Sequence, residues 1–117
     1  MTETTRRIVE AIRAVPRGRV SCYRDIALAA GLPNGSRQVV RILHSMSKTE
    51  RLPWHRIIRA DGRIALPPGG GMELQAALLH SEGVKVHASG RVDSAFWLTL
   101  REIHAAAPTQ SASHRRS

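Results

Sequence analysis

The chain has little cysteine, few aromatic residues and few acidic residues. Cys22 is the only cysteine among 117 residues, so no disulfide can form within the chain. The histidines are scattered and show no zinc-ligand spacing with the cysteine. No apolar run approaches the length of a membrane span, and no signal-peptide pattern opens the chain. We therefore expect no metal, no cofactor and no membrane partner, and we expect a cytoplasmic protein.

The scarcity of acidic residues leaves a large positive charge. Eighteen Lys and Arg residues face nine Asp and Glu residues, which gives a net charge of +9, and most of the cations are arginines. Such an excess on a short chain favours a polyanionic partner, with nucleic acid first. Guanidinium groups match phosphates and base edges well. An ordinary basic protein from an arginine-rich proteome would show the same balance, so charge alone leaves both interpretations open.

The first half of the chain has the pattern of a helix-turn-helix. Apolar residues at helical spacing predict a helix over residues 4–15, a second helix capped by Ser21 and ended by Gly31, and a third after residues 32–34. Arg37, Arg41 and His44 share one polar face of the third helix. Such a face is either ordinary solvated surface or a DNA-binding surface. Its place in a helix-turn-helix of a basic protein favours DNA.

The second half is predicted to mix short extended segments with two further helices. Asp61-Gly62 within residues 55–66 predicts a two-residue β-hairpin turn, and a hairpin after a helix-turn-helix is typical of a winged helix. Residues 67–71 predict a loop, followed by a helix over about 72–82 that buries Leu74 and Leu78, with Ala77 beside them. Residues 84–86 and 91–92 should be extended, and 94–106 helical. A mobile basic tail is predicted beyond Pro108.

The segment Leu52-Pro53-Trp54-His55-Arg56-Ile57-Ile58 resembles the Pro-Cys-His-Arg active-site segment of O6-alkylguanine-DNA alkyltransferases, with Trp54 in place of the cysteine. Residues 15–27, 36–39 and 78–84 are similar to three further segments of that family, in the same order and spacing. A tryptophan at this position marks the alkyltransferase-like proteins. The resemblance implies a mainly α fold with short β segments, a winged helix-turn-helix like the alkyltransferase C-terminal domain, over residues 1–107, with residues 108–117 as the tail.

The resemblance also implies a function without catalysis. In the alkyltransferases a thiolate attacks the alkyl carbon, and the indole of Trp54 offers no comparable lone pair. The chain is therefore expected to be a damage-recognition protein that binds and flips O6-alkylguanine in double-stranded DNA. It would flag the lesion for nucleotide excision repair proteins, as a monomer, associated with the nucleoid if the source is bacterial.

Individual site residues follow from the resemblance. Arg37 corresponds to an arginine that fills the gap left by the flipped base, and Tyr23 to a tyrosine that presses on the backbone phosphate. The predicted lesion pocket contains Tyr23, Trp54, His55, Arg56 and Glu82, of which His55 and Glu82 match relay positions of the parent enzyme. The predicted DNA-binding residues are Tyr23, Ser36, Arg37, Gln38, Arg41 and His44. Each has a plainer interpretation, such as core filler for Trp54 and Tyr23 or surface charge for Arg37.

Two other functions stay open at this point. One is an alkyltransferase that uses Cys22, although this residue lies outside the nucleophile position and a buried, inert thiol is the alternative. The other is a winged-helix transcription factor that reads a sequence through Arg37, Arg41 and His44. Departures from the family pattern at Val40-Arg41 and at Pro67-Pro68 leave the preferred adduct undetermined.

Overall fold

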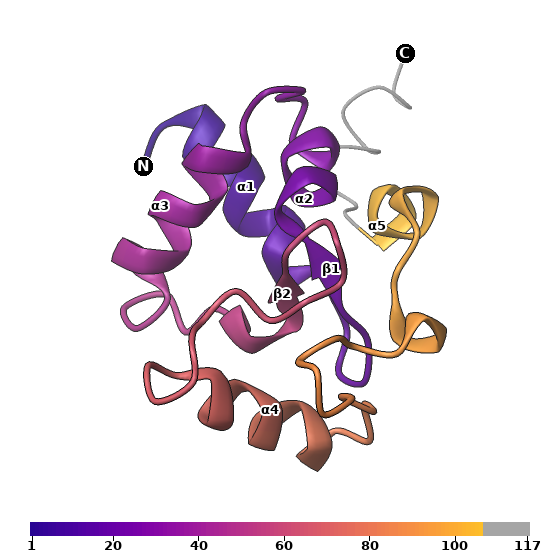
Figure 1. Cartoon of the computed structure of the whole chain (residues 1–117). Coiled ribbons are helices and arrows are strands. Elements are labelled where there is room, and N and C mark those ends of the chain that lie inside the picture. Colours follow the sequence, from indigo (N-terminus) through magenta and orange to yellow (C-terminus); the bar gives the residue numbers. More distant parts are fainter. Residues whose placement is uncertain (107–117) are drawn as a thin grey trace.

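Helices α1, α2 and α3 lie on one side of a short two-stranded sheet, and α4 lies on the other (Figure 1). The computed structural model describes residues 1–106, so the predicted tail lies outside the described residues. The elements in order are α1 (Glu3–Arg13), β1 (Ser21–Cys22), α2 (Tyr23–Ala29), α3 (Ser36–Met46), the 3-10 turn η1 (Trp54–Arg56), β2 (Ile57–Ile58), α4 (Met72–Ser81), the 3-10 turn η2 (Ser94–Phe96) and α5 (Leu100–Ala106). The predicted mainly α fold with short β segments is confirmed.

The predicted helix-turn-helix is formed by α2 and α3, which pack on each other and on α1. Ile26 of α2 and Val39 of α3 are fully buried among the apolar residues of α1. Gly31 follows the end of α2 with a φ of +82°, in agreement with the prediction. The predicted cap at Ser21 is wrong, because Ser21 belongs to β1 and its hydroxyl is buried without a hydrogen-bond partner.

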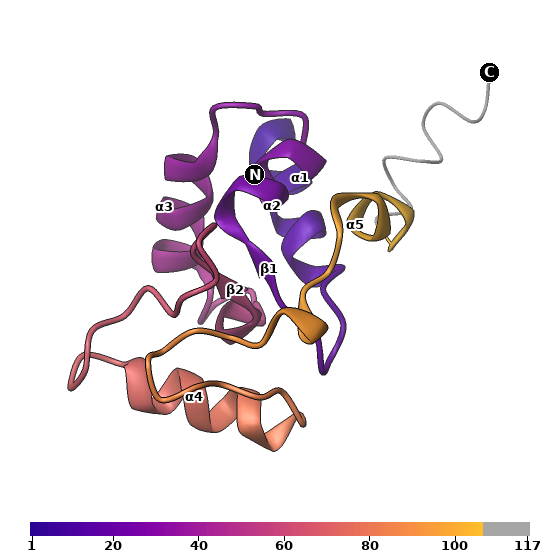
Figure 2. The same cartoon turned by 45° about the vertical axis from the view of Figure 1, so that its right-hand side comes forward.

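The sheet joins two separate apolar clusters. β1 and β2 pair in parallel, with Ser21 opposite Ile57 and Cys22 opposite Ile58. Since neighbouring side chains on a strand point to opposite faces, Ile57 packs with α1, α2 and α3, whereas Ile58 packs with Leu79 of α4 and its neighbours. The strands therefore connect the helix-turn-helix to the α4 side of the molecule (Figure 2).

The hairpin prediction is only partly correct. A turn forms at this place, but the bond from Gly62 N–H to Arg59 O at 2.9 Å puts Ala60 and Asp61 at its centre instead of Asp61 and Gly62. Arg59 N–H also donates to Arg63 O at 2.9 Å. The returning arm does not pair with β2. Instead Ile64 N–H donates to Gly90 O at 2.9 Å and Val92 N–H to Gly62 O at 2.8 Å, so the returning arm pairs with residues 90–92.

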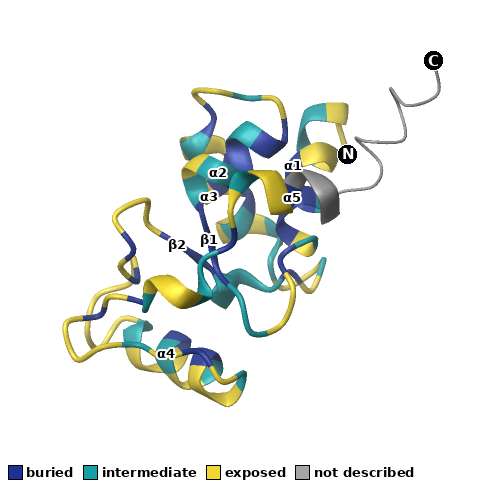
Figure 3. Ribbon diagram, turned by 90° about the vertical axis from the view of Figure 1, so that its right-hand side faces the viewer, coloured by how far each residue is buried: buried dark blue, intermediate teal, exposed yellow. Residues whose placement is uncertain are grey.

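The buried face of α4 also differs from the prediction. Leu79 and Gln75 are buried, whereas Leu74 is 56% exposed, Ala77 is exposed and Leu78 is only half-buried. The buried stripe faces the sheet and the outer face is open to solvent (Figure 3). The spacing of apolar residues did not predict the buried face of α4, because Gln75, a polar residue, occupies part of that face.

The predicted helix over 94–106 is interrupted at residues 97–99. Leu98 N–H donates to Val20 O at 2.7 Å, and Val20 N–H donates to Phe96 O at 2.9 Å, so this segment is extended beside Val20. Thr99 and Glu102 then form a capping box that starts α5, with bonds of 3.1 and 2.8 Å. Within the described residues, no helix is long and apolar enough to cross a membrane.

Candidate nucleic-acid interface and lesion pocket

A hollow of about 260 Å³ opens between the start of α2, the middle of α3 and η1. We call it the lesion hollow, after the lesion pocket that was predicted from the sequence. Tyr23 and Trp54 both line it and both are half-buried. The remaining lining residues are Val40, Leu43, His44, Ser47, Ile57, Leu66 and Gln75. The structure thus brings two residues of the predicted pocket to one concavity, and Trp54 is a wall of that concavity rather than core filler.

The position of Trp54 is fixed through its backbone. The 3-10 turn after Pro53 is closed by a 3.0 Å bond from Arg56 N–H to Pro53 O. The side-chain amide of Gln75, which is 2% exposed, donates to the carbonyls of His55 at 3.1 Å and Ile57 at 3.3 Å. Sequence reasoning missed Gln75, since a single glutamine inside an apolar helix pattern carries no signal of such a role.

His55, Arg56 and Glu82 form a hydrogen-bonded cluster behind Trp54. Glu82 is 4% exposed in its side chain and lies 2.8 Å from His55 Nε2 and 2.8 Å from Arg56 Nη2. It also accepts a bond from the backbone N–H of Gly18 at 3.1 Å. Burial alone would raise the pKa of Glu82, but the bonds from Arg56, His55 and Gly18 outweigh it and hold the pKa at about 2. Glu82 is therefore a carboxylate at any ordinary pH.

This cluster does not line the lesion hollow. His55 stands edge-on to the Trp54 ring, with the ring centroids 6.0 Å apart. Arg56 donates to Val15 O at 3.0 Å and so ties the Trp54 segment to the loop after α1. Of the five predicted pocket residues, Tyr23 and Trp54 line the hollow and the other three support the segment that carries Trp54.

The predicted DNA-binding residues gather at the start of α2 and along α3. Arg37, Gln38, Arg41 and His44 are all exposed, and none forms an ion pair among the described residues. Ser36 and Tyr23 share a shallow groove of about 400 Å³ with Arg24 and Arg59, two basic residues that sequence reasoning did not single out.

Tyr23 is suited to donate a hydrogen bond at this surface. Burial raises the pKa of Tyr23, although the charge of Arg59 opposes the effect. The phenol therefore keeps its proton. A protonated phenol at the junction of the groove and the lesion hollow can donate to an acceptor such as a phosphate oxygen.

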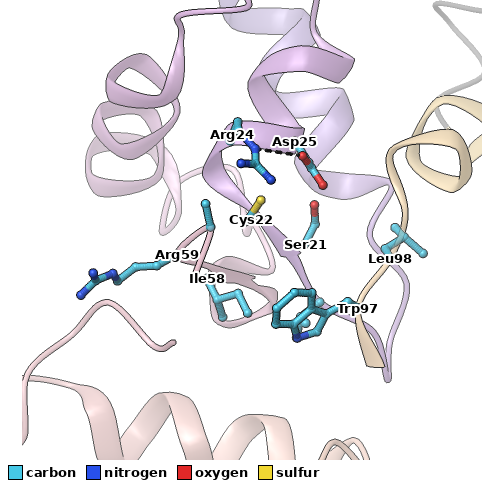
Figure 4. Close-up of a pocket in the computed structure, with 10 residues that line it drawn as sticks. Ser21, Cys22, Arg24, Asp25, Ile58, Arg59, Trp97 and Leu98 are labelled. Carbon is cyan, nitrogen blue, oxygen red and sulfur yellow. Dashed lines mark ion pairs between the residues drawn. The ribbon is translucent and has the colours of Figure 1, made fainter. Parts of the chain in front are cut away.

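Cys22 faces a different and much smaller cavity. Its thiol lies in a cavity of about 50 Å³ that is also lined by Ser21, Arg24, Asp25 and Trp97 (Figure 4). Cys22 is 9% exposed, and burial raises the pKa of its thiol. A protonated thiol is a poor nucleophile, and Cys22 is not part of the lesion hollow.

Residues 3–84 match the family described as 6-O-methylguanine DNA methyltransferase, DNA binding domain. The chain belongs to this family. It is 38% identical to the DNA base-flipping protein of Escherichia coli over 87 residues, 74% of this chain and 67% of that protein. It is 32% identical to alkyltransferase-like protein 1 of Schizosaccharomyces pombe over 74% of this chain and 82% of that protein. The chain is thus similar to relatives that are named as base-flipping and alkyltransferase-like proteins.

The chain is also similar to proteins that are named as methyltransferases. The methylated-DNA–protein-cysteine methyltransferase of Rattus norvegicus is 33% identical over 68% of this chain, but the match spans only 39% of that protein. Among solved structures, S. pombe Atl1 in complex with damaged DNA containing O6-carboxymethylguanine has a TM-score of 0.70 at 27% identity. The structural alignment with Atl1 covers 85% of this chain and 97% of the Atl1 chain. The O6-methylguanine methyltransferase of Mycobacterium tuberculosis has a TM-score of 0.55 at 28% identity, over 70% of this chain and 49% of that one.

Proposed function

We propose that the protein recognises O6-alkylguanine in double-stranded DNA, holds the flipped base in the lesion hollow and does not remove the alkyl group. The observation that carries the proposal is the position of Trp54, which lines an open hollow together with Tyr23. A half-buried aromatic side chain that lines an open hollow beside a helix-turn-helix offers a flipped base a stacking partner. The base-flipping name of the E. coli relative and the damaged DNA bound by Atl1 support the same function.

The exposed face of α3 supplies the contacts to the duplex. Arg37, Arg41 and the neighbouring polar side chains neutralise phosphates, which gives general affinity for DNA. Arg37, near the start of α3, fills the gap in the base stack. Tyr23 donates to the backbone phosphate at the edge of the lesion hollow and favours rotation of the nucleotide toward Trp54.

The absence of alkyl transfer follows from the residues around the hollow. An alkyl group needs a soft nucleophile for displacement, and an indole N–H acts only as a donor. Cys22, the sole thiol, is buried in a separate cavity and protonated. The protein therefore recognises the lesion without repairing it. Bound to the lesion as a monomer, it recruits nucleotide excision repair proteins, which carry out the excision.

The test compares affinities for matched duplexes that contain guanine or O6-methylguanine at one position, at a fixed salt concentration. We expect clearly tighter binding to the O6-methylguanine duplex. Affinity for both duplexes should fall with salt by roughly 0.9 log unit per log unit of salt for each phosphate neutralised. Equal affinity for both duplexes rules the proposal out, and strong preference for one undamaged sequence would favour a transcription factor.

A second measurement separates recognition from repair. The protein is incubated with the O6-methylguanine duplex, and its intact mass is measured for wild type and for Cys22→Ser. We expect no gain in mass for either protein. A mass gain of one methyl group in wild type that Cys22→Ser abolishes would identify an alkyltransferase that uses Cys22.

A further inference from the structure

A second hollow lies beside Trp54 on the side of the loop that follows α3. It has a volume of about 540 Å³ and is lined by His44, Ser47, Lys48, Arg51, Leu52, Trp54 and His55. We call it the basic hollow. His44, Ser47 and Trp54 line both the basic hollow and the lesion hollow. The two hollows therefore adjoin, with Trp54 at their border.

The two hollows differ in charge. Lys48 and Arg51 line the basic hollow, whereas no lysine or arginine lines the lesion hollow. Both cations are exposed, and within the described part of the chain neither forms an ion pair. The neighbouring Glu50 does not neutralise them, because its carboxylate is 3.0 Å from Arg13 Nη2 of α1. The basic hollow thus has positive charge and no acidic lining residue.

The loop holds these cations next to Trp54. It is closed by a bond from Leu52 N–H to Ser47 O at 2.9 Å and by one from Glu50 N–H to Met46 O at 2.8 Å. Arg51 has a φ of +52°, the only positive φ of a residue other than glycine in residues 1–106. This backbone conformation is costly for a residue with a side chain. The segment is therefore a defined turn that starts directly from the end of α3.

The position of Trp54 gives the direction in which an adduct extends. In the alkyltransferase reaction the nucleophile attacks the alkyl carbon attached to O6, so the alkyl group of a bound lesion faces the nucleophile position. Under the proposed function, on which this inference rests, Trp54 occupies that position. The alkyl group then points at Trp54, which lines both the lesion hollow and the basic hollow.

We propose that the basic hollow receives the far end of the adduct, and that Lys48 and Arg51 select O6-alkylguanines whose alkyl group ends in a carboxylate. A carboxylate there accepts charge-assisted hydrogen bonds from an ammonium and a guanidinium group. A neutral tail of the same size gains neither. Because both cations are exposed to solvent, we expect the gain to be moderate, about five- to tenfold in affinity.

The test uses four matched duplexes that carry guanine, O6-methylguanine, O6-carbamoylmethylguanine or O6-carboxymethylguanine at one position, all at the same salt concentration. The amide and the carboxylate have nearly the same size and differ in charge. We measure wild type, the double variant Lys48→Gln/Arg51→Gln, and the control Lys85→Gln/Arg101→Gln, which removes two exposed cations that do not line either hollow.

Wild type and the control should bind the carboxylate duplex about five- to tenfold more tightly than the amide duplex. The Lys48→Gln/Arg51→Gln variant should lose the preference for the carboxylate duplex over the amide duplex. It should keep its preference for O6-methylguanine over guanine. If wild type binds the carboxylate duplex no more tightly than the amide duplex, the inference is overturned. A parallel loss of affinity for all four duplexes in that variant also overturns it, because Lys48 and Arg51 would then be ordinary phosphate contacts. Failure of the proposed function would be recognised separately, by equal affinity for guanine and O6-methylguanine in wild type.

Discussion

The imidazole Nε2 of His55 lies 2.8 Å from carboxylate Oε2 of Glu82, a residue 27 positions further along the chain. This bond joins η1, which carries Trp54, to the end of α4. Arg56 binds the same carboxylate, so two consecutive residues after Trp54 are tied to one buried acid. The cluster therefore supports the segment that carries Trp54.

We predict that Glu82→Gln lowers the free energy of unfolding by about 3 kcal/mol at neutral pH, because Arg56 then loses its buried counter-ion. The folded chain holds the pKa of Glu82 at about 2, below the ordinary value of 4.5. Its contribution is therefore complete above about pH 4.5 and is lost as the pH falls toward 2. Urea denaturation of wild type between those pH values should show this loss.

Glu73→Gln is the matched control for that change. Glu73 is an exposed carboxylate on the same helix, and both its oxygens accept from the backbone N–H of Gly69 in an exposed loop. We expect a small effect on the free energy of unfolding. If Glu82→Gln and Glu73→Gln had equal effects and equal pH profiles, the cluster would contribute nothing to stability.

Gln75→Leu should loosen the Trp54 segment without changing the DNA-binding face of α3. The substitution removes the donor to His55 O and Ile57 O and leaves these carbonyls without that partner in the core. We expect a loss of about 1–3 kcal/mol in the free energy of unfolding. The affinity for the guanine duplex should persist, while the preference for O6-methylguanine over guanine decreases. An unchanged preference in a folded variant would show that Gln75 does not position Trp54 for binding.

Gly62→Ala tests the contact between the 59–63 turn and the Trp97 ring. Gly62 has a φ of +87°, and an added Cβ would clash with Cζ2 of the Trp97 ring. The control is Gly69→Ala, at a φ of +78° with nothing within 4 Å of the added Cβ. We expect Gly69→Ala to cost about 1 kcal/mol and Gly62→Ala about 3 kcal/mol or more in urea denaturation. Equal costs would mean that the ring moves away freely.

The helix-turn-helix could be predicted from sequence because local patterns specify it, whereas the Trp54 segment was identified only by its resemblance to a known family. Apolar residues at helical spacing predicted α3, and Val39 and Ile42 are buried on one side of that helix. The pairing of Ile64 with Gly90 and the extended segment around Leu98 depend on partners far along the chain, which a local pattern does not encode. The buried face of α4 was misjudged for the same reason, since the partners of Gln75 are backbone carbonyls of a distant segment.

Arg37→Ala should weaken lesion binding more than binding to undamaged DNA. Arg37 is exposed near the start of α3, and a group that fills the gap in the base stack stabilises only the flipped state. We expect about a tenfold loss for the O6-methylguanine duplex and a smaller loss for the guanine duplex. Arg101→Ala, which removes the same charge from α5, is the control. Equal losses on both duplexes would make Arg37 a phosphate contact only.

Tryptophan fluorescence can show whether the flipped base lies against Trp54. The chain has two tryptophans, so a Trp97→Phe variant, once shown to be folded, leaves Trp54 as the only indole. The variant is titrated to saturation with the guanine duplex and with the O6-methylguanine duplex. We predict that the O6-methylguanine duplex quenches the emission of Trp54 strongly, because a stacked base contacts the indole, and that the guanine duplex does so much less. Saturation by the lesion duplex with no more quenching than the guanine duplex causes would contradict the account.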